Sequence, residues 1–282
     1  MNNFFKRTIT GACIVIFCLC GFWLHPISFF ISGIIILAGT QYEYYSLIKN
    51  SGGAKPKIIL GMLTSLSAYI LSTLIASGLL DAKYIAVLML FLLTAMIAEL
   101  YNKEEKPFDS LAHTFFPVLY VGLPLCLFPF AAFSHTGLST LLPHNCGVFS
   151  PGLIIGFFAL IWANDTGAYL VGITFGRHRL FERISPKKSW EGFVGGVILA
   201  AVLGWILSGW LGVVSGIQWV IIALIVSVFG TYGDLIESML KRSVGVKDSG
   251  SIMPGHGGFL DRFDSTLVAF PAIYLFILFF VY

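Results

Sequence analysis

The sequence predicts an all-α, polytopic integral membrane protein with about nine transmembrane helices and a cytoplasmic N-terminus. Composition is the first reason for this prediction. The hydrophobic residues AVILMFWYC make up 57% of the 282 residues and charged residues only 11%, under half of the roughly 25% charge in an ordinary soluble domain. So few charges could hardly cover a soluble surface, and intrinsic disorder is excluded because it requires low hydrophobicity.

The second reason is the length of the apolar stretches. About 20 apolar residues in a helix cross the roughly 30 Å of hydrocarbon in a bilayer, and nine stretches approach or reach that length. They cover residues 8–24, 27–48, 58–77, 84–100, 111–133, 152–175, 193–214, 219–236 and 266–282.

The distribution of Lys and Arg predicts the orientation, because cytoplasmic loops carry an excess of these residues. If the N-terminus lies inside and successive loops alternate, 16 of the 17 Lys and Arg fall in inside segments, and Lys83 is the one outside. We therefore expect a multi-pass protein of the cell inner membrane.

The loops leave no room for a separate soluble domain, so we expect one membrane domain over residues 1–282. Residues 1–150 supply the N-terminal spans. Residues 151–282 supply the remaining spans and the two inside loops that are rich in polar residues, 176–191 and 241–265. We expect the functional site of the protein in this C-terminal half, on its cytoplasmic side.

Carboxylates in or beside the C-terminal spans are the first candidates for a functional site, because a charge at mid-membrane costs about 2.5–3.5 kcal/mol. Asp234 and Glu237 are three residues apart, as are Asp261 and Asp264, and this spacing puts each pair on one helix face. Two such faces could hold a hard cation, which prefers oxygen ligands. The alternative is that some of these carboxylates only pair with nearby basic residues, which are Lys241, Arg242 and Arg262.

The loop between the two acidic pairs combines basic residues, glycines and a histidine. Basic side chains bind phosphate, glycines let backbone N–H groups approach it closely, and a histidine can donate a hydrogen bond or move a proton. The residues concerned are Lys241, Arg242, Lys247, Gly255, His256, Gly257 and Gly258. Taken alone, the glycines could form an ordinary turn and the basic residues could anchor the membrane surface.

The other inside loop places Lys187 and Lys188 where they could meet an anionic phosphate, and Trp190 suits a membrane interface. Glycines at positions 192, 195 and 196 follow. We expect these glycines to serve close helix packing rather than ligand binding. Asp165 lies within the span at 152–175, where an ionisable residue indicates a functional role.

These motifs resemble the phosphatidate cytidylyltransferase, or CDP-diacylglycerol synthase, family. The resemblance is carried by Ser-Met-Leu-Lys-Arg at 238–242, Lys-Asp at 247–248, Pro-Gly-His-Gly-Gly at 254–258 and Asp-Arg-Phe-Asp at 261–264. Met253 is the one departure, where the family usually has Leu, Ile or Phe. Segments 164–169 and 185–192 also match, so the resemblance is specific over residues 162–265.

The resemblance implies a membrane enzyme that joins CTP to phosphatidate, giving CDP-diacylglycerol and pyrophosphate, with Mg²⁺ required. It implies a metal centre on Asp234 and Asp261, which a monovalent cation can share. Family members can be dimers, and no nucleic acid partner is expected.

The residues then take three expected roles. Catalytic roles are expected for Asp234, Asp261, Lys247 and His256. Substrate contacts are expected for Lys187, Lys188, Lys241, Arg242, Gly255, Gly257, Gly258 and Arg262. Metal ligands or their support are expected at Asp165, Asp234, Glu237, Asp261 and Asp264.

Two other functions compete with this reading. One is a related membrane lipid kinase. The other is a cation-coupled transporter, which an acidic residue within a span would suit. Against transport, the acidic residues cluster toward one membrane face and no inverted repeat is evident.

Overall fold

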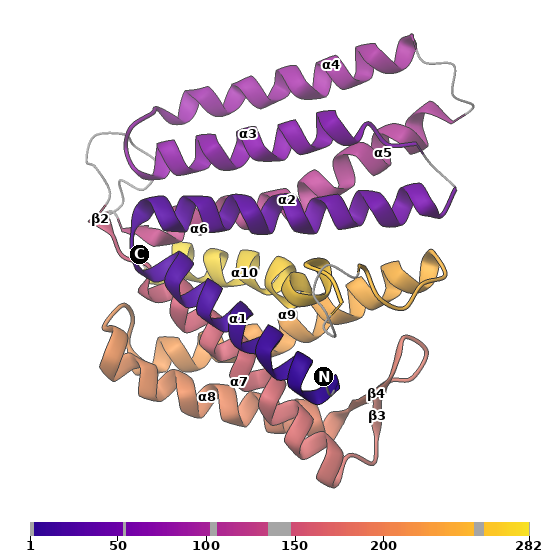
Figure 1. The fold of residues 1–282 in the computed structure, drawn as a ribbon. Coiled ribbons are helices and arrows are strands. Elements are labelled where there is room, and N and C mark those ends of the chain that lie inside the picture. Colours follow the sequence, from indigo (N-terminus) through magenta and orange to yellow (C-terminus); the bar gives the residue numbers. More distant parts are fainter. Residues whose placement is uncertain (1–2, 53–54, 102–105, 135–147, 251–256, 282) are drawn as a thin grey trace. The chain divides into compact units, whose positions relative to one another are not determined.

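The computed structural model describes residues 3–52, 55–101, 106–134, 148–250 and 257–281, and these are mostly helical (Figure 1). The chain forms two compact units. The first comprises Met1–Ser150 and Val244–Phe263, and the second comprises Pro151–Ser243 and Asp264–Tyr282. The loop that carries the glycine motif therefore belongs to the N-terminal unit.

Within the described residues, seven helical segments are long and apolar enough to cross a membrane. They are Ile58–Ala76, Ala82–Leu100, Pro107–Ala132, Gly152–Phe175, Trp190–Leu211, Gly216–Ser243 and Leu260–Phe280, and a shorter apolar helix covers Thr10–Trp23. The expectation of a helical, multi-pass membrane protein is confirmed. The count of nine spans and the cytoplasmic N-terminus stay predictions.

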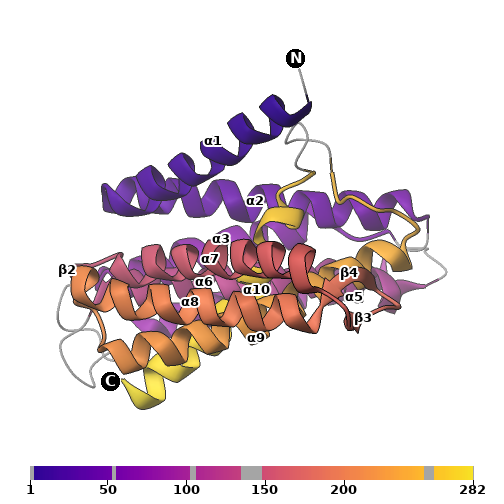
Figure 2. The same cartoon turned by 90° about the horizontal axis from the view of Figure 1, so that it is seen from below.

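The first unit contains most of the N-terminal helices. They are α1 (Asn3–Trp23), α2 (Pro26–Asn50), α3 (Ile58–Ala76), η1 (Ala82–Val87), α4 (Leu88–Leu100), α5 (Pro107–Pro117), η2 (Val118–Gly122) and α6 (Leu123–Ala132). A short antiparallel pair, β1 (Phe133–Ser134) and β2 (Val148–Phe149), follows α6. Helices α2 and α3 lie side by side in both views (Figures 1 and 2).

Helix α2 begins where its sequence indicates. The His25 ring nitrogen Nδ1 accepts a hydrogen bond from the Ile27 N–H at 3.1 Å, and Pro26 occupies the first helical position, where its fixed φ favours a helix start. The second half of α2 carries polar residues, and Thr40, Gln41 and Glu43 are all buried. The Gln41 amide donates to Ser65 Oγ of α3 at 2.9 Å, so these polar groups face protein rather than lipid.

The second unit contains α7 (Gly152–Phe175), α8 (Trp190–Leu211), α9 (Gly216–Ser243) and most of α10 (Leu260–Phe280). Helices α7 and α8 run side by side (Figures 1 and 2). A Cβ added at Gly196 would lie 2.7 Å from the Asn164 carbonyl oxygen, and one at Gly192 would lie 2.8 Å from the Ala168 carbonyl oxygen. The predicted packing role of these glycines is confirmed.

An antiparallel hairpin, β3 (Arg179–Phe181) and β4 (Ser185–Ser189), connects α7 to α8. The all-α prediction agrees with the helical fold, and within the described residues this hairpin and the β1–β2 pair are short additions to it. The polar segment between α7 and α8 is long enough to fold back and pair its own backbone groups, which otherwise need other partners. Ser189 caps α8 by accepting the Gly192 N–H at 3.1 Å, and Glu191 accepts the N–H groups of Arg177 and His178.

Candidate metal and phosphate site

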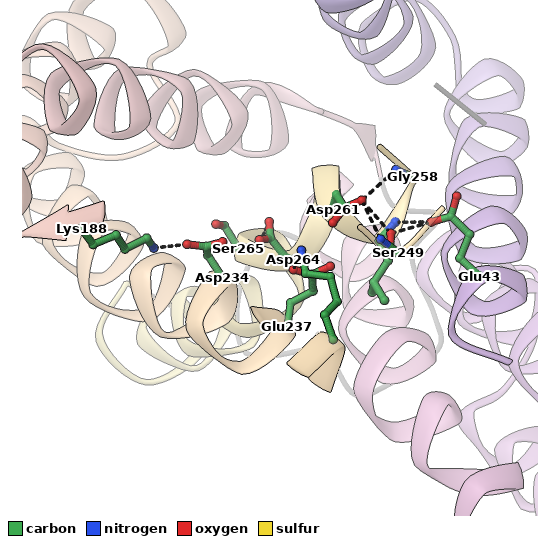
Figure 3. Close-up of polar contacts among 11 residues, drawn as sticks. Glu43, Lys188, Asp234, Glu237, Ser249, Gly258, Asp261, Asp264 and Ser265 are labelled. Carbon is green, nitrogen blue, oxygen red and sulfur yellow. Dashed lines mark hydrogen bonds and ion pairs between the residues drawn. The ribbon is translucent and has the colours of Figure 1, made fainter. Parts of the chain in front are cut away.

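Three carboxylates gather in the second unit. Asp234 and Glu237 lie on α9 and Asp264 lies on α10, and one oxygen from each lies within 4.8 Å of the others (Figure 3). Glu237 and Asp264 are buried, and Asp234 is half-buried. The structure therefore brings one predicted acidic pair together with a member of the other pair.

Gly233 allows α9 to approach α10 at this point. A Cβ at Gly233 would lie 2.6 Å from the Asp264 carbonyl oxygen and 2.9 Å from Ser265 Cα. Both neighbours are backbone atoms, which cannot move aside as a flexible side chain could. The glycine that precedes Asp234 in the sequence is therefore a packing requirement for the carboxylate cluster.

Two lysines balance part of the negative charge. Lys188 of β4 forms an ion pair with Asp234 (Figure 3). Lys241 forms an ion pair with Glu237, which lies one helical turn before it on α9. The Lys241–Glu237 pair is buried. The sequence left open that acidic residues only pair with nearby basic residues, and this applies to Glu237, which pairs with Lys241. Lys188, which was expected to contact substrate, contacts the Asp234 carboxylate in this structure.

The carboxylate cluster fits a divalent cation. Its ligands are all carboxylate oxygens, as Mg²⁺ and Ca²⁺ prefer, and oxygens on opposite sides of a Mg²⁺ ion lie about 4.2 Å apart. The three oxygens lie within 4.8 Å of one another, slightly more than that span, so small side-chain movements would bring them to one Mg²⁺ ion. The Lys188 ammonium already shows that a positive charge sits beside Asp234.

Asp261 lies in the first unit, in a separate group of polar contacts. Its Oδ2 accepts hydrogen bonds from the Ser249 N–H at 3.1 Å, the Ser249 hydroxyl at 2.9 Å and the Gly258 N–H at 2.8 Å (Figure 3). Asp261 therefore ties the two ends of the glycine loop together. Its expected partnership with Asp234 at a metal stays a prediction.

Glu43 of α2 joins the same group, and the sequence did not assign it a role. Its Oε2 accepts the Leu260 N–H at 2.9 Å and lies 3.1 Å from the Ser249 hydroxyl. A Cβ at Gly250 would lie 2.7 Å from Glu43 Oε1, and one at Gly39 would lie 2.8 Å from the Phe259 ring. The segment around Ser249 and Leu260 thus packs tightly on α2. The sequence signal that could have identified Glu43 is the presence of an ionisable residue within an apolar stretch.

The remaining predicted residues take varied positions. Gly257 is described with a φ of 80°, which favours glycine, and Gly258 packs beside Glu43. Gly255 and His256 lie outside the described residues. Asp165 is exposed on α7 and is not part of the three-carboxylate cluster, so its metal role stays a prediction. Among the predicted substrate-contacting and catalytic residues, the exposed basic side chains are Lys187, Arg242, Lys247 and Arg262.

The fold and the site define a class of protein: a multi-pass helical membrane protein with a carboxylate cluster that could hold a cation and two lysines paired with that cluster. Comparison with known proteins agrees with this class and narrows it. The chain belongs to the cytidylyltransferase family, whose model matches residues 5–280. The family resemblance of the sequence motifs is confirmed.

Individual relatives carry a more specific name. A phosphatidate cytidylyltransferase of Bacillus subtilis is 39% identical over 192 residues, which cover 67% of this chain and 64% of the relative. One from Staphylococcus saprophyticus is 46% identical over 122 residues, covering 43% of this chain and 46% of the relative. The matched part of the chain thus spans less than two thirds of the length of these relatives.

Proposed function

We propose that this protein transfers the cytidylyl group of CTP to phosphatidate, giving CDP-diacylglycerol and pyrophosphate. The observation that carries the proposal is the cluster of Asp234, Glu237 and Asp264, with Lys188 beside it, in a member of the cytidylyltransferase family. The names of the relatives support phosphatidate as the lipid substrate.

The reaction joins two anions. A phosphate oxygen of phosphatidate forms a bond to the α-phosphorus of CTP, and the bond from that phosphorus to the oxygen bridging the β-phosphate breaks. The electron pair leaves with pyrophosphate. A phosphomonoester has a second pKa of about 6, so the attacking oxygen is largely deprotonated near neutral pH. The protein therefore does not need a strong general base.

The main requirement is to offset the repulsion between phosphates. Asp234, Glu237 and Asp264 would hold Mg²⁺, which neutralises phosphate charge when bound. Lys188 pairs with Asp234 in this structure, and this position beside the carboxylates supports a second role for its ammonium, contact with a substrate phosphate. Lysine binds phosphate as a point charge, which supports the predicted substrate contact of Lys188.

The glycine loop has a supporting role in this proposal. Its backbone N–H groups and the exposed Lys247 would bind phosphate, and Asp261 with Ser249 and Gly258 would keep the ends of the loop in place. Arg242 and Arg262 are exposed, which supports contact with anionic groups of the substrates. The metal role of Asp261 is supported only by the family motif Asp-Arg-Phe-Asp at residues 261–264.

The test is release of pyrophosphate by the purified full-length protein supplied with CTP, phosphatidate and Mg²⁺. We expect stoichiometric pyrophosphate and CDP-diacylglycerol, loss of both after chelation with EDTA, and recovery on adding Mg²⁺. The variant Asp234→Asn removes one carboxylate charge and should lower kcat by at least about a hundredfold, as expected when a group that stabilises transition-state charge is lost.

The same experiment separates the alternatives. A lipid kinase would label the lipid from γ-labelled nucleotide and release no pyrophosphate. A transporter would move substrate into liposomes without chemical change. Either result in the wild-type protein would refute the proposed reaction, and full activity in EDTA would remove the cation from it.

A further inference from the structure

A pocket in the second unit lies between the hairpin and two helices. Its volume is about 410 Å³, within the roughly 300–1,000 Å³ of small-molecule sites. Its walls include Phe181 of β3, Trp190 and Phe193 of α8, and Val228, Tyr232 and Leu235 of α9. The α9 residues recur at helical spacing, so a single apolar face of this helix forms one wall.

The Lys188–Asp234 ion pair lies on the elements that form the pocket, although neither residue lines the pocket itself. Lys188 lies on β4, in the same hairpin as Phe181, and two residues before Trp190. Asp234 lies on α9 directly before Leu235. The ion pair therefore joins two walls of the pocket, the hairpin and α9. The apolar pocket and the lysine proposed to bind phosphate therefore belong to the same two elements.

The rim of the pocket suits a membrane interface. Trp190 and Tyr232 have 54% and 53% of their surface exposed, and Trp and Tyr are enriched where lipid meets water. In a chain that spans a membrane, exposed apolar side chains on its helices contact lipid rather than water. A lipid tail can reach this pocket from the bilayer while its headgroup stays at the interface.

We propose that this pocket takes an acyl chain of phosphatidate and directs its phosphate toward Lys188. The inference rests on the proposed function and adds the binding site for the lipid tail. An acyl chain fits better than the cytosine ring, because the walls are mainly hydrocarbon and aromatic. The lining offers few polar partners, among them the Thr231 hydroxyl, so a buried base would leave most of its hydrogen-bonding groups unpaired, at a cost that an acyl chain avoids.

The substitution Val228→Phe tests the proposal by filling the pocket from α9. The matched control is Val202→Phe, which adds the same ring at an exposed position of α8 outside the pocket walls. KM and kcat are measured with dioleoyl phosphatidate in mixed micelles, with dihexanoyl phosphatidate, and with varied CTP. A second pocket variant, Phe181→Ala, removes part of a wall on the exposed hairpin and does not disturb helix packing.

We expect Val228→Phe to raise the KM for dioleoyl phosphatidate about tenfold, because overpacking a filled site is costly. The KM for the short-chain lipid and for CTP should stay unchanged, and Val202→Phe should match the wild type. Phe181→Ala should also raise the KM for the long-chain lipid alone.

Three results overturn the proposal. A raised KM for CTP alone would assign the pocket to the nucleotide. Equal KM values for the long-chain lipid in wild type and both pocket variants would show that the tail binds elsewhere, even though the enzyme is active. A wild-type protein that releases no pyrophosphate from either lipid would refute the proposed function itself, and the tail site with it.

Discussion

At the scale of single residues, the structure connects a carboxylate of the second helix to the C-terminal motif. Glu43 accepts the backbone N–H of Leu260, the first residue of α10, and Ser249 lies between the carboxylates of Glu43 and Asp261. A negative charge at a helix N-terminus is stabilising. Glu43 therefore acts as a positioning residue for the glycine loop and for Asp261.

Replacing Glu43 tests this positioning role. Glu43→Ala leaves the Leu260 N–H without its acceptor and should lower kcat by about ten- to a hundredfold, since a small misplacement of reacting groups has effects of that size. Glu43→Gln keeps an acceptor oxygen of the same shape and should restore most of kcat. The measurement is kcat and KM for both substrates, with the thermal midpoint of each variant.

The matched control is Glu99→Ala. Glu99 is also a buried glutamate of the first unit and accepts the Ser110 hydroxyl at 2.6 Å, with Lys57 at 3.6 Å. We expect Glu99→Ala to lower the thermal midpoint while kcat of the folded fraction stays near the wild-type value. If Glu43→Ala and Glu99→Ala behave alike, Glu43 contributes only to folding stability.

At the scale of elements, close approach of α9 and α10 forms the carboxylate cluster. The approach depends on Gly233, because a side chain there would meet the backbone of Asp264 and Ser265. Helix propensity alone would favour alanine at this position by about 1 kcal/mol. The glycine thus lowers local helix stability and in return permits the contact between the helices.

The substitution Gly233→Ala should separate α9 from α10 and weaken cation binding. We expect the Mg²⁺ concentration for half-maximal activity to rise at least about tenfold, consistent with an overpacking cost of about 1–3 kcal/mol. Gly230→Ala, one turn earlier, is the control, because its Cβ would lie at an ordinary 3.6 Å from Ser265 Cβ. Wild-type Mg²⁺ dependence in Gly233→Ala would show that the cluster does not hold the cation.

At the scale of the whole molecule, charge distribution predicts how the protein sits in the membrane. Lys83 is the one basic residue assigned to the outside, and Arg183 lies in the exposed turn of the β3–β4 hairpin assigned to the inside. Both side chains are exposed, so each position suits chemical labelling. The expectation that the site faces the cytoplasm, where CTP would reach it, depends on this orientation.

Cysteine labelling tests the orientation. In a variant with the five native cysteines replaced, Lys83→Cys should react with a membrane-impermeant maleimide in right-side-out vesicles. Arg183→Cys should react in inverted vesicles only. The reverse pattern would place the hairpin outside and would contradict a cytoplasmic site for CTP.

The sequence alone determined the membrane character and the identity of most candidate residues. The membrane character follows from composition and from the length of the apolar stretches. The pairs Asp234/Glu237 and Asp261/Asp264 follow from a spacing of three residues within one helix. The packing role of Gly192 and Gly196 was also predictable, because small residues permit close helix contacts. These inferences need only residues that are near one another in the chain.

Only the tertiary structure decided which distant residues meet. Glu43 and Ser249 are 206 positions apart, and nothing in the periodicity of two apolar helices says which faces contact. The ion pair of Lys188 with Asp234 depends on the hairpin, which the sequence suggested only as a polar loop. Contacts of this kind arise from the packing of whole elements, and hydrophobic patterning specifies that an apolar face is buried without specifying its partner.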